Sequence, residues 1–240
     1  MNKETIQNSS RQNEILENLS VVQDRIIQAT TTVKRSPEEI TLVAVSKTYP
    51  VSDNLILQQL GISDYAENRE SEGAVKSAEF SLGNSAPARW HYQGKIQSNK
   101  IKSLANWADV IHSLDEIRYV PLLAKAVPKG KTMEIFVQVS LDLQAGRGGA
   151  PPSDLAFLAD SVRSMSNLRL RGIMAVAPVD EDPDLAFSRL AAIHADFKAE
   201  FPDSPFLSAG MSGDFESAII HGATHVRIGS SILGSRGRQR

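Results

Sequence analysis

In Ile40-Thr41-Leu42-Val43-Ala44-Val45-Ser46-Lys47, a short apolar run rich in β-branched residues ends in a lysine. An apolar run of this length is typical of a parallel strand that is buried on both faces. The carboxyl ends of such strands carry the active sites of α/β folds. In dry surroundings a lysine amine can form a Schiff base with an aldehyde, whereas many lysines at strand ends are solvated surface charges. Both interpretations of Lys47 are open at this point.

Seven further apolar runs follow, and helical patterns lie between them. Together with the first run, the predicted strands are 40–46, 63–66, 89–92, 109–112, 134–140, 170–176, 205–209 and 224–228. This repeated alternation of strand and helix favours a single (β/α)8 TIM barrel over an open doubly wound sheet. The run 63–66 is the weakest of these strands, and the open sheet is the alternative if it fails.

An additional N-terminal helix precedes the first strand, because apolar residues recur there at helical spacing. They are Ile15, Leu19, Val22 and Ile26. Later helix starts are indicated by the capping-box pattern at 113–116 and by Ser153-Asp154 before an apolar segment. We predict a disordered tail over 1–10, the barrel over 11–236 and a basic tail over 237–240.

Composition excludes several classes of protein. The chain has 240 residues, of which 41% are hydrophobic and 22% charged, enough for one substantial core. A net charge of −2 and a pI near 6.2 give no electrostatic argument for nucleic acid or an anionic membrane. The absence of cysteine excludes disulfides and thiolate chemistry. Without a signal sequence or a membrane-length apolar run, we expect a cytoplasmic protein.

Two loops after predicted strands have the composition of phosphate sites. Residues 208–214 are Ser-Ala-Gly-Met-Ser-Gly-Asp, and residues 227–231 are Arg-Ile-Gly-Ser-Ser. Glycines let the backbone approach an anion, serines donate hydrogen bonds, and the following helices present their N-termini. Barrels often bind phosphate through the loops after strands seven and eight. Alternatively, these are ordinary turns in which Asp214 and Ser231 cap helices. Together with Lys47 they indicate a phosphorylated aldehyde, and pyridoxal 5′-phosphate (PLP) fits that description.

Several motifs, in the same order, resemble the YggS/PROSC family of PLP-binding proteins, the PLP homeostasis proteins, whose fold is similar to the barrel domain of alanine racemase. The motifs occupy residues 42–47, 67–69, 90–100, 112–115, 170–174, 207–214 and 226–229. The resemblance implies that Lys47 holds PLP as a covalent Schiff base (imine) and that Arg227 faces the pyridine nitrogen. It implies further cofactor-binding residues, namely Asn68, Met174, Ser208, Ser212, Gly229 and Ser230.

Other residues are less informative. In the loop after the fifth strand, Arg147 stands where many family members have lysine, so its contacts stay open. The basic cluster Lys95, Lys100 and Lys102 is either an anion site or, as we favour, a solvated helix face. We interpret His91 as a hydrogen-bonded structural residue rather than a general base. The remaining histidines, His112, His194, His221 and His225, lack metal-ligand spacing, so we expect no metal.

The implied function follows from what surrounds the PLP ring. A guanidinium beside the pyridine nitrogen disfavours its protonation, which makes the ring a poor electron sink. Racemisation also needs a second base, which the racemase takes from a C-terminal domain that this chain is too short to contain. We therefore expect a protein of PLP and vitamin B6 homeostasis that buffers or delivers PLP without turnover and has no catalytic residue. The alternatives are a PLP-dependent amino-acid racemase and a Schiff-base aldolase without PLP.

The expected partners are PLP itself and apo-enzymes that use PLP. We expect neither nucleic acid nor a membrane as a partner, and a monomeric protein.

Overall fold

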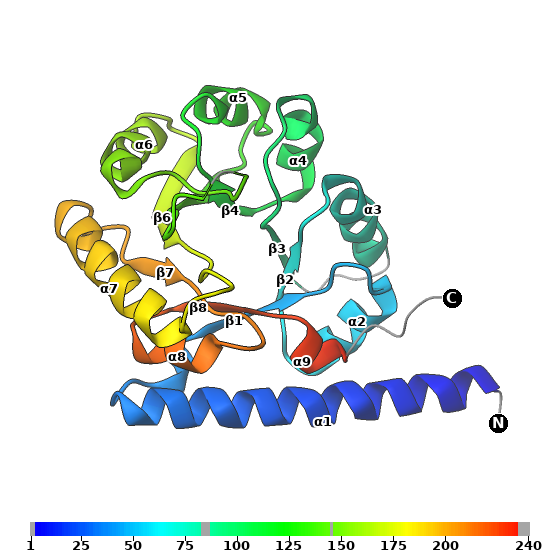
Figure 1. Cartoon of the computed structure of the whole chain (residues 1–240). Helices are drawn as coiled ribbons and strands as arrows, with labels where there is room; N and C mark the ends of the chain where they lie inside the picture. The colour runs from blue at the N-terminus through cyan, green and yellow to red at the C-terminus, as the bar shows by residue number, and fades with distance from the viewer. Residues whose placement is uncertain (1–2, 83–86, 145, 235–240) are drawn as a thin grey trace.

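A closed ring of eight parallel strands forms the centre of the protein, and helices surround it (Figure 1). The computed structural model describes residues 3–82, 87–144 and 146–234. The strands are β1 (Thr41–Val45), β2 (Asp64–Glu67), β3 (Arg89–Tyr92), β4 (Val110–Leu114), β5 (Met133–Gln138), β6 (Leu168–Met174), β7 (Phe206–Ser208) and β8 (His225–Ile228). They pair in chain order, and β8 pairs with β1 to close the ring. The predicted barrel is confirmed, including the weakest strand, which matches β2 with a shift of one residue.

The outer helices follow the strands along the chain. They are α2 (Val51–Gln59), α3 (Glu70–Ser81), α4 (Ile101–Trp107), α5 (Tyr119–Ala126), α6 (Leu155–Arg163), α7 (Pro183–Glu200), α8 (Phe215–Ile220) and α9 (Ser230–Leu233), with short 3-10 turns at Pro37–Glu39, Ser98–Lys100 and Pro152–Asp154. Among the described residues, no helix has both the length and the apolar character needed to cross a membrane.

The predicted capping box at 113–116 is wrong. Ser113 and Leu114 belong to the fully buried strand β4, and α5 begins only at Tyr119. The Ser113 hydroxyl donates instead to the carbonyl oxygen of Gly94 at 2.6 Å. The capping pattern is local, whereas strand pairing across the barrel decides where β4 ends.

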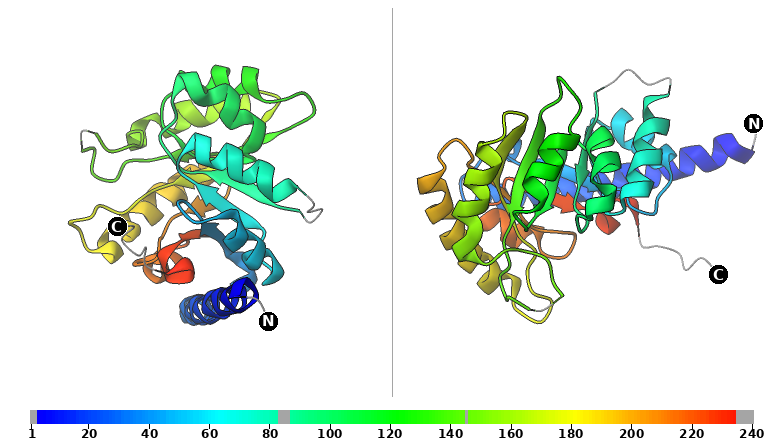
Figure 2. Two further views of the ribbon diagram at one scale, coloured as in Figure 1. Left: turned by 90° about the vertical axis from the view of Figure 1, so that its right-hand side faces the viewer. Right: turned by 90° about the horizontal axis from the view of Figure 1, so that it is seen from above.

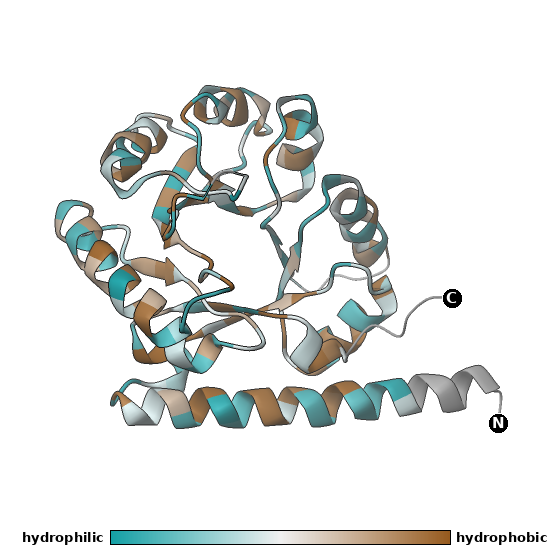
Figure 3. Ribbon diagram, viewed as in Figure 1, coloured by the Kyte–Doolittle hydropathy of each residue, from teal (hydrophilic) through white to brown (hydrophobic). Residues whose placement is uncertain are grey.

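Helix α1 (Lys3–Thr32) lies along the outside of the barrel and packs against α2, α8 and α9 (Figure 1). Its N-terminal end extends past the barrel (Figure 2). Apolar residues recur along it between hydrophilic ones (Figure 3). The four residues that predicted an amphipathic helix are buried, which confirms that prediction. Arg11 fixes the helix to the barrel, because its guanidinium donates to Asp53 at 2.6 Å and to the carbonyl oxygen of Leu233 at 3.0 Å.

The predicted chain ends are only partly within the described residues. Helix α1 begins at Lys3, so it occupies most of the segment 1–10 for which the sequence predicts a tail. Met1 and Asn2 lie outside the described residues, as does the predicted basic tail 237–240. The boundaries 11–236 for the barrel domain stay a prediction.

The barrel interior holds both apolar and polar side chains. One apolar cluster contains Val43, Val45 and Ala66, and another contains Val110, Phe136 and Met174. Beside them lie five polar side chains that are at most 3% exposed, namely His91, His112, Ser208, His225 and Arg227. Barrel interiors are ordinarily filled by branched apolar residues, so this polar set depends on internal hydrogen bonds.

His225 gives the interior a pH-dependent stability. Its ring is buried and lies edge-on to Phe136 and Phe206. Burial lowers the pKa of His225 from 6.5 to about 3, so the residue is neutral in the folded protein. Because the folded pKa is depressed, the stability is complete above the unfolded value and is lost as the pH falls from 6.5 toward 3.

We expect acidification from pH 7 to pH 5 to lower the free energy of unfolding by ~2 kcal/mol through His225 alone. His112, whose pKa burial also lowers well below 6.5, adds to the loss in the same direction. Urea unfolding of the wild type and of His225→Phe at both pH values measures the difference. An identical pH dependence in the two proteins would contradict this assignment.

Candidate cofactor site

The predicted site residues lie at or beside the carboxyl ends of five strands. Lys47 follows β1, Asn68 follows β2, Met174 ends β6, Ser208 ends β7, Ser212 follows β7, Arg227 lies in β8, and Gly229 and Ser230 follow β8. All strands are parallel, so these ends open on one side of the barrel, its carboxyl-terminal face. Hydrogen bonds join Ser208 to Arg227 and Gly229 to Ser212. The other four share this face without such a bond to one another among the described residues.

Lys47 stands in the turn that follows β1, and it is partly buried. Val43 and Val45, the last alternate residues of β1, belong to an interior cluster. The residue after Lys47, Thr48, has φ 70°, a left-handed conformation that is rare for a β-branched residue. Its N–H donates to the side chain of Glu72 in α3. The turn after Lys47 is therefore strained and is held by a neighbouring helix.

A buried ion pair supports the same turn. Lys76 of α3 donates from Nζ to Glu67 Oε1 at 2.6 Å and to the carbonyl oxygen of Ser46 at 2.8 Å. The Ser46 hydroxyl also donates to Glu67 Oε1, at 2.8 Å. Burial raises the pKa of Glu67, and the hydrogen bond and charge of Lys76 oppose that effect. Lys76 thus fixes the residue before Lys47, a role that no local sequence pattern indicated.

The two Gly/Ser loops meet at the Ser212 hydroxyl. Ser212 Oγ accepts from the N–H of Gly229 at 3.4 Å and from the N–H of Ser231 at 3.3 Å. These distances exceed the usual range for N–H···O bonds, so the contacts are weak. Helices α8 and α9 span only six and four residues. The backbone N–H groups and hydroxyls are therefore better candidate anion donors than the helix dipoles invoked from the sequence.

Gly229 brings the loop after β8 close to β1. A Cβ atom at this position would lie 2.9 Å from the carbonyl oxygen of Val45 and 3.2 Å from its Cβ. Such a contact is too short, so only glycine fits without a shift of the backbone. The absence of a side chain thus places the donors of this loop next to the strand that carries Lys47.

Arg227 is a buried cation below the carboxyl-terminal face. It donates from Nη1 to Ser208 Oγ at 2.6 Å and from Nη2 to the carbonyl oxygen of Ala175 at 3.1 Å. Burial lowers the pKa of Arg227 to about 10, which still leaves it charged at neutral pH. A guanidinium has five N–H donors and no acceptor. Arg227 can therefore donate to a ligand atom but cannot accept a proton from one.

The remaining candidates from the sequence are Arg147 and the basic cluster. Arg147 lies 2.8 Å from Asp142 and lines a small hollow of about 200 Å³ with Gln138 and Ser140. In the basic cluster, Lys95 and Lys102 are exposed, and Lys100 lies 3.6 Å from Glu70. Within the described residues, no group of three His, Cys, Asp or Glu side chains is placed to hold a metal ion.

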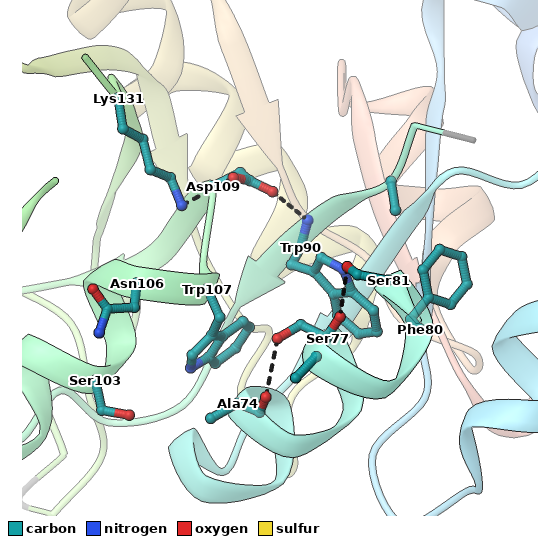
Figure 4. Close-up of a pocket in the computed structure, with 12 residues that line it drawn as sticks. Ala74, Ser77, Phe80, Ser81, Trp90, Ser103, Asn106, Trp107, Asp109 and Lys131 are labelled. Carbon is teal, nitrogen blue, oxygen red and sulfur yellow. Dashed lines mark hydrogen bonds and ion pairs between the residues drawn. The ribbon is translucent and has the colours of Figure 1, made fainter. Parts of the chain in front are cut away.

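A separate pocket of about 550 Å³ lies between α3 and α4, outside the barrel (Figure 4). None of the predicted site residues lines it. Lys131 pairs with Asp109 at 3.1 Å, and the other Asp109 oxygen accepts from the N–H of Trp90 at 3.0 Å. The indole nitrogen of Trp107 has no partner among the described residues, but it is buried away from solvent. We assign this pocket no part in the site.

The barrel, the strand-end lysine and the paired Gly/Ser loops define a protein of the alanine racemase barrel class. The chain matches the family model "Alanine racemase, N-terminal domain" over residues 18–237. It is 38% identical over 243 residues to the pyridoxal phosphate homeostasis protein of Mycobacterium tuberculosis (strain ATCC 25618 / H37Rv), with 94% of each protein covered. To the protein of the same name from Escherichia coli (strain K12) it is 36% identical, covering 93% of this chain and 97% of the relative. The chain belongs to the alanine racemase N-terminal domain family and, within it, to the pyridoxal phosphate homeostasis proteins.

Solved structures show the same fold. PipY of Synechococcus elongatus PCC7942 with PLP bound is 28% identical with a TM-score of 0.74, covering 87% of this chain and 100% of that one. Alanine racemase from Corynebacterium glutamicum has a TM-score of 0.67 at 12% identity, covering 95% of this chain and 62% of that one. At that identity, the racemase shares the fold alone.

Proposed function

We propose that this protein binds PLP at the carboxyl-terminal face of its barrel as a Schiff base on Lys47, and that it buffers or delivers PLP without turning over a substrate. The observation that carries the proposal is the convergence of Lys47, the Ser212–Gly229 contact and Arg227 on one face. The PLP-bound PipY, 28% identical to this chain, supports it. We also propose that apo-enzymes that use PLP receive it from this protein, and that the protein is a monomer in the cytoplasm.

The residues of the face fit the parts of PLP. The weak contacts between Ser212 and the N–H groups of Gly229 and Ser231 leave these donors available for phosphate oxygens. Ser230 is exposed beside them, and its hydroxyl would add a further donor. Met174 supplies an apolar surface, and Asn68 supplies an amide at the edge of the face. Lys47 would provide the amine that bonds to the aldehyde.

When bound, PLP supplies an electron-withdrawing ring that can stabilise negative charge on an attached amino acid. Arg227 opposes this use, because a fixed cation with no acceptor disfavours protonation of a nitrogen placed before it. An unprotonated ring nitrogen withdraws less charge. The residues of this chain therefore favour holding PLP over using it as a catalyst, as the name of the relatives also suggests.

An absorption spectrum of the purified protein tests the binding proposal. A visible band should appear with PLP, and borohydride should bleach it and leave a PLP adduct on the peptide that contains Lys47. An adduct on another peptide, with Lys47 unmodified, would refute the site. An aldolase that works without PLP would show no visible band at all.

Amino-acid exchange tests the absence of turnover. In deuterated solvent with L-alanine, we expect neither α-deuterium nor D-alanine above the level produced by free PLP. The PLP-loaded protein should also restore activity to a PLP-dependent apo-enzyme over time, because a carrier must release its cargo. Catalytic formation of D-alanine would favour a racemase over a carrier.

Gly229→Ala should weaken PLP binding by roughly tenfold or more, because the added Cβ would push the phosphate donors away from β1. The matched control is Gly213→Ala in the loop after β7, where a Cβ would meet no atom within 4 Å. Fluorescence titration with PLP, and with pyridoxal, which lacks the phosphate, separates the contribution of the phosphate to the binding free energy from that of the rest of the ligand. Equal PLP affinity in the two variants would argue against the phosphate site.

A further inference from the structure

A continuous chain of hydrogen bonds crosses the barrel interior from β2 to β8. It links Asp64 Oδ1 to His91 Nε2 at 2.9 Å, His91 Nδ1 to His112 Nε2 at 2.7 Å, His112 Nδ1 to Ser208 Oγ at 2.8 Å, and Ser208 Oγ to Arg227 Nη1 at 2.6 Å. The two histidines and Ser208 are fully buried. The chain thus connects the start of β2 with the cation below the carboxyl-terminal face.

Both ends of the chain have a fixed polarity. Arg227 can only donate. At the other end burial would raise the pKa of Asp64, but the hydrogen bond from His91 and the charge of Arg89 lower it below the usual value. Asp64 is therefore a carboxylate, which can only accept. A chain with a pure donor at one end and a pure acceptor at the other favours one direction for every bond between them.

The hydrogen bonds in the middle of this chain also run from Arg227 toward Asp64. Burial lowers the pKa of His112 well below 6.5, and the charge of Arg227 acts in the same direction, so the His112 ring is neutral and has one donor and one acceptor. If His112 donated to Ser208, the serine oxygen would accept from both sides. Its own proton would then have no acceptor among the described residues, and a buried unpaired donor is unfavourable. Ser208 must therefore donate to His112, and His112 to His91.

We propose that Asp64, His91, His112 and Ser208 are positioning residues that orient Arg227 through a one-way chain of hydrogen bonds running from Arg227 to Asp64. The chain keeps a lone pair of Ser208 turned toward Nη1, while the carbonyl oxygen of Ala175 holds Nη2. Two fixed acceptors define the plane of a guanidinium. Only the contact between Arg227 and the PLP ring rests on the proposed function, because the chain itself belongs to the protein without ligand.

Histidine tautomers in the ligand-free protein test the chain directly. In long-range proton–nitrogen NMR spectra at neutral pH, we expect His91 and His112 each to carry the ring proton on Nε2 and to leave Nδ1 unprotonated. The variant His112→Phe assigns the resonances of His112. The phenylalanine ring can keep the stacking on Phe136, whose ring centroid lies 4.6 Å from the centroid of the imidazole. A proton on Nδ1 of His112, or a cationic His112, would overturn the proposal.

A matched pair of variants tests the effect on Arg227. His112 and His225 are both buried and both contact Phe136, but only His112 belongs to the chain. With nitrogen-labelled PLP, His112→Phe and Ser208→Ala should shift the pyridine nitrogen resonance and weaken PLP binding by about tenfold. His225→Phe should leave both unchanged.

Two failures are distinguishable. If the unmodified protein gives no bound PLP resonance, the proposed function fails, and the tautomers still decide whether the chain exists. If PLP binds but all three variants shift its resonance equally, the positioning role fails while PLP binding stands.

Discussion

Lys47→Ala is expected to abolish the visible absorption band and the borohydride-stable adduct while the barrel stays folded. The covalent bond to PLP requires a primary amine, and alanine supplies none. Folding should persist because Lys47 is only partly buried, and the ion pair of Glu67 and Lys76 that supports its turn is untouched. Some PLP should still bind, since hydrogen bonds to a charged group are each worth about 1.5–3 kcal/mol.

Lys95→Ala is the control for this variant. Lys95 is an exposed lysine that follows β3 just as Lys47 follows β1, so it shares the carboxyl-terminal face without the proposed role. Its variant should keep the band and the adduct. Mass spectrometry of the reduced proteins compares them, and an adduct that survives in Lys47→Ala would move the Schiff base to another residue.

The strands were predictable because each apolar run is local. Residues such as Val43, Val45 and Ala66 pack inside the barrel, and the periodicity of a run does not depend on its partners. The capping box at 113–116 failed for the opposite reason. Pairing with β5 extends β4 to Leu114, because Leu114 pairs with Val137, a residue outside any local sequence window.

The residues of the candidate site also divide into those that local sequence indicates and those that only the folded barrel brings together. Lys47 and the loops with Ser212 and Gly229 were recognisable from local composition, because each needs a particular residue type at a strand end. The chain through His91 and His112 was not, since these residues are 21 positions apart and His112 is 96 positions from Ser208. His91 is hydrogen-bonded at both ring nitrogens, as expected of a structural residue, but its partners depended on the barrel being closed.

Of the substitutions proposed for this protein, Gly172→Ala should lower the free energy of unfolding most. Gly172 lies in β6 opposite Phe206 of β7, next to the irregularity in the pairing of β5 with β6. A Cβ atom there would lie 1.8 Å from the carbonyl oxygen of Phe206, and the backbone has φ 156°. Because backbone atoms of the adjacent strand form the obstacle, no rotamer change can relieve the contact.

We expect Gly172→Ala to lower the free energy of unfolding by more than about 4 kcal/mol, or to prevent accumulation of soluble protein. Gly222→Ala separates the close approach from backbone strain, because Gly222 has φ 99° but no atom within 4 Å of a Cβ position. That control should cost only about 1–3 kcal/mol, the value for an unfavourable backbone conformation. Urea unfolding followed by tryptophan fluorescence compares the two. Similar stabilities would mean that β6 and β7 can separate at this point, and the register that places Met174 and Ser208 at the carboxyl-terminal face would not depend on glycine.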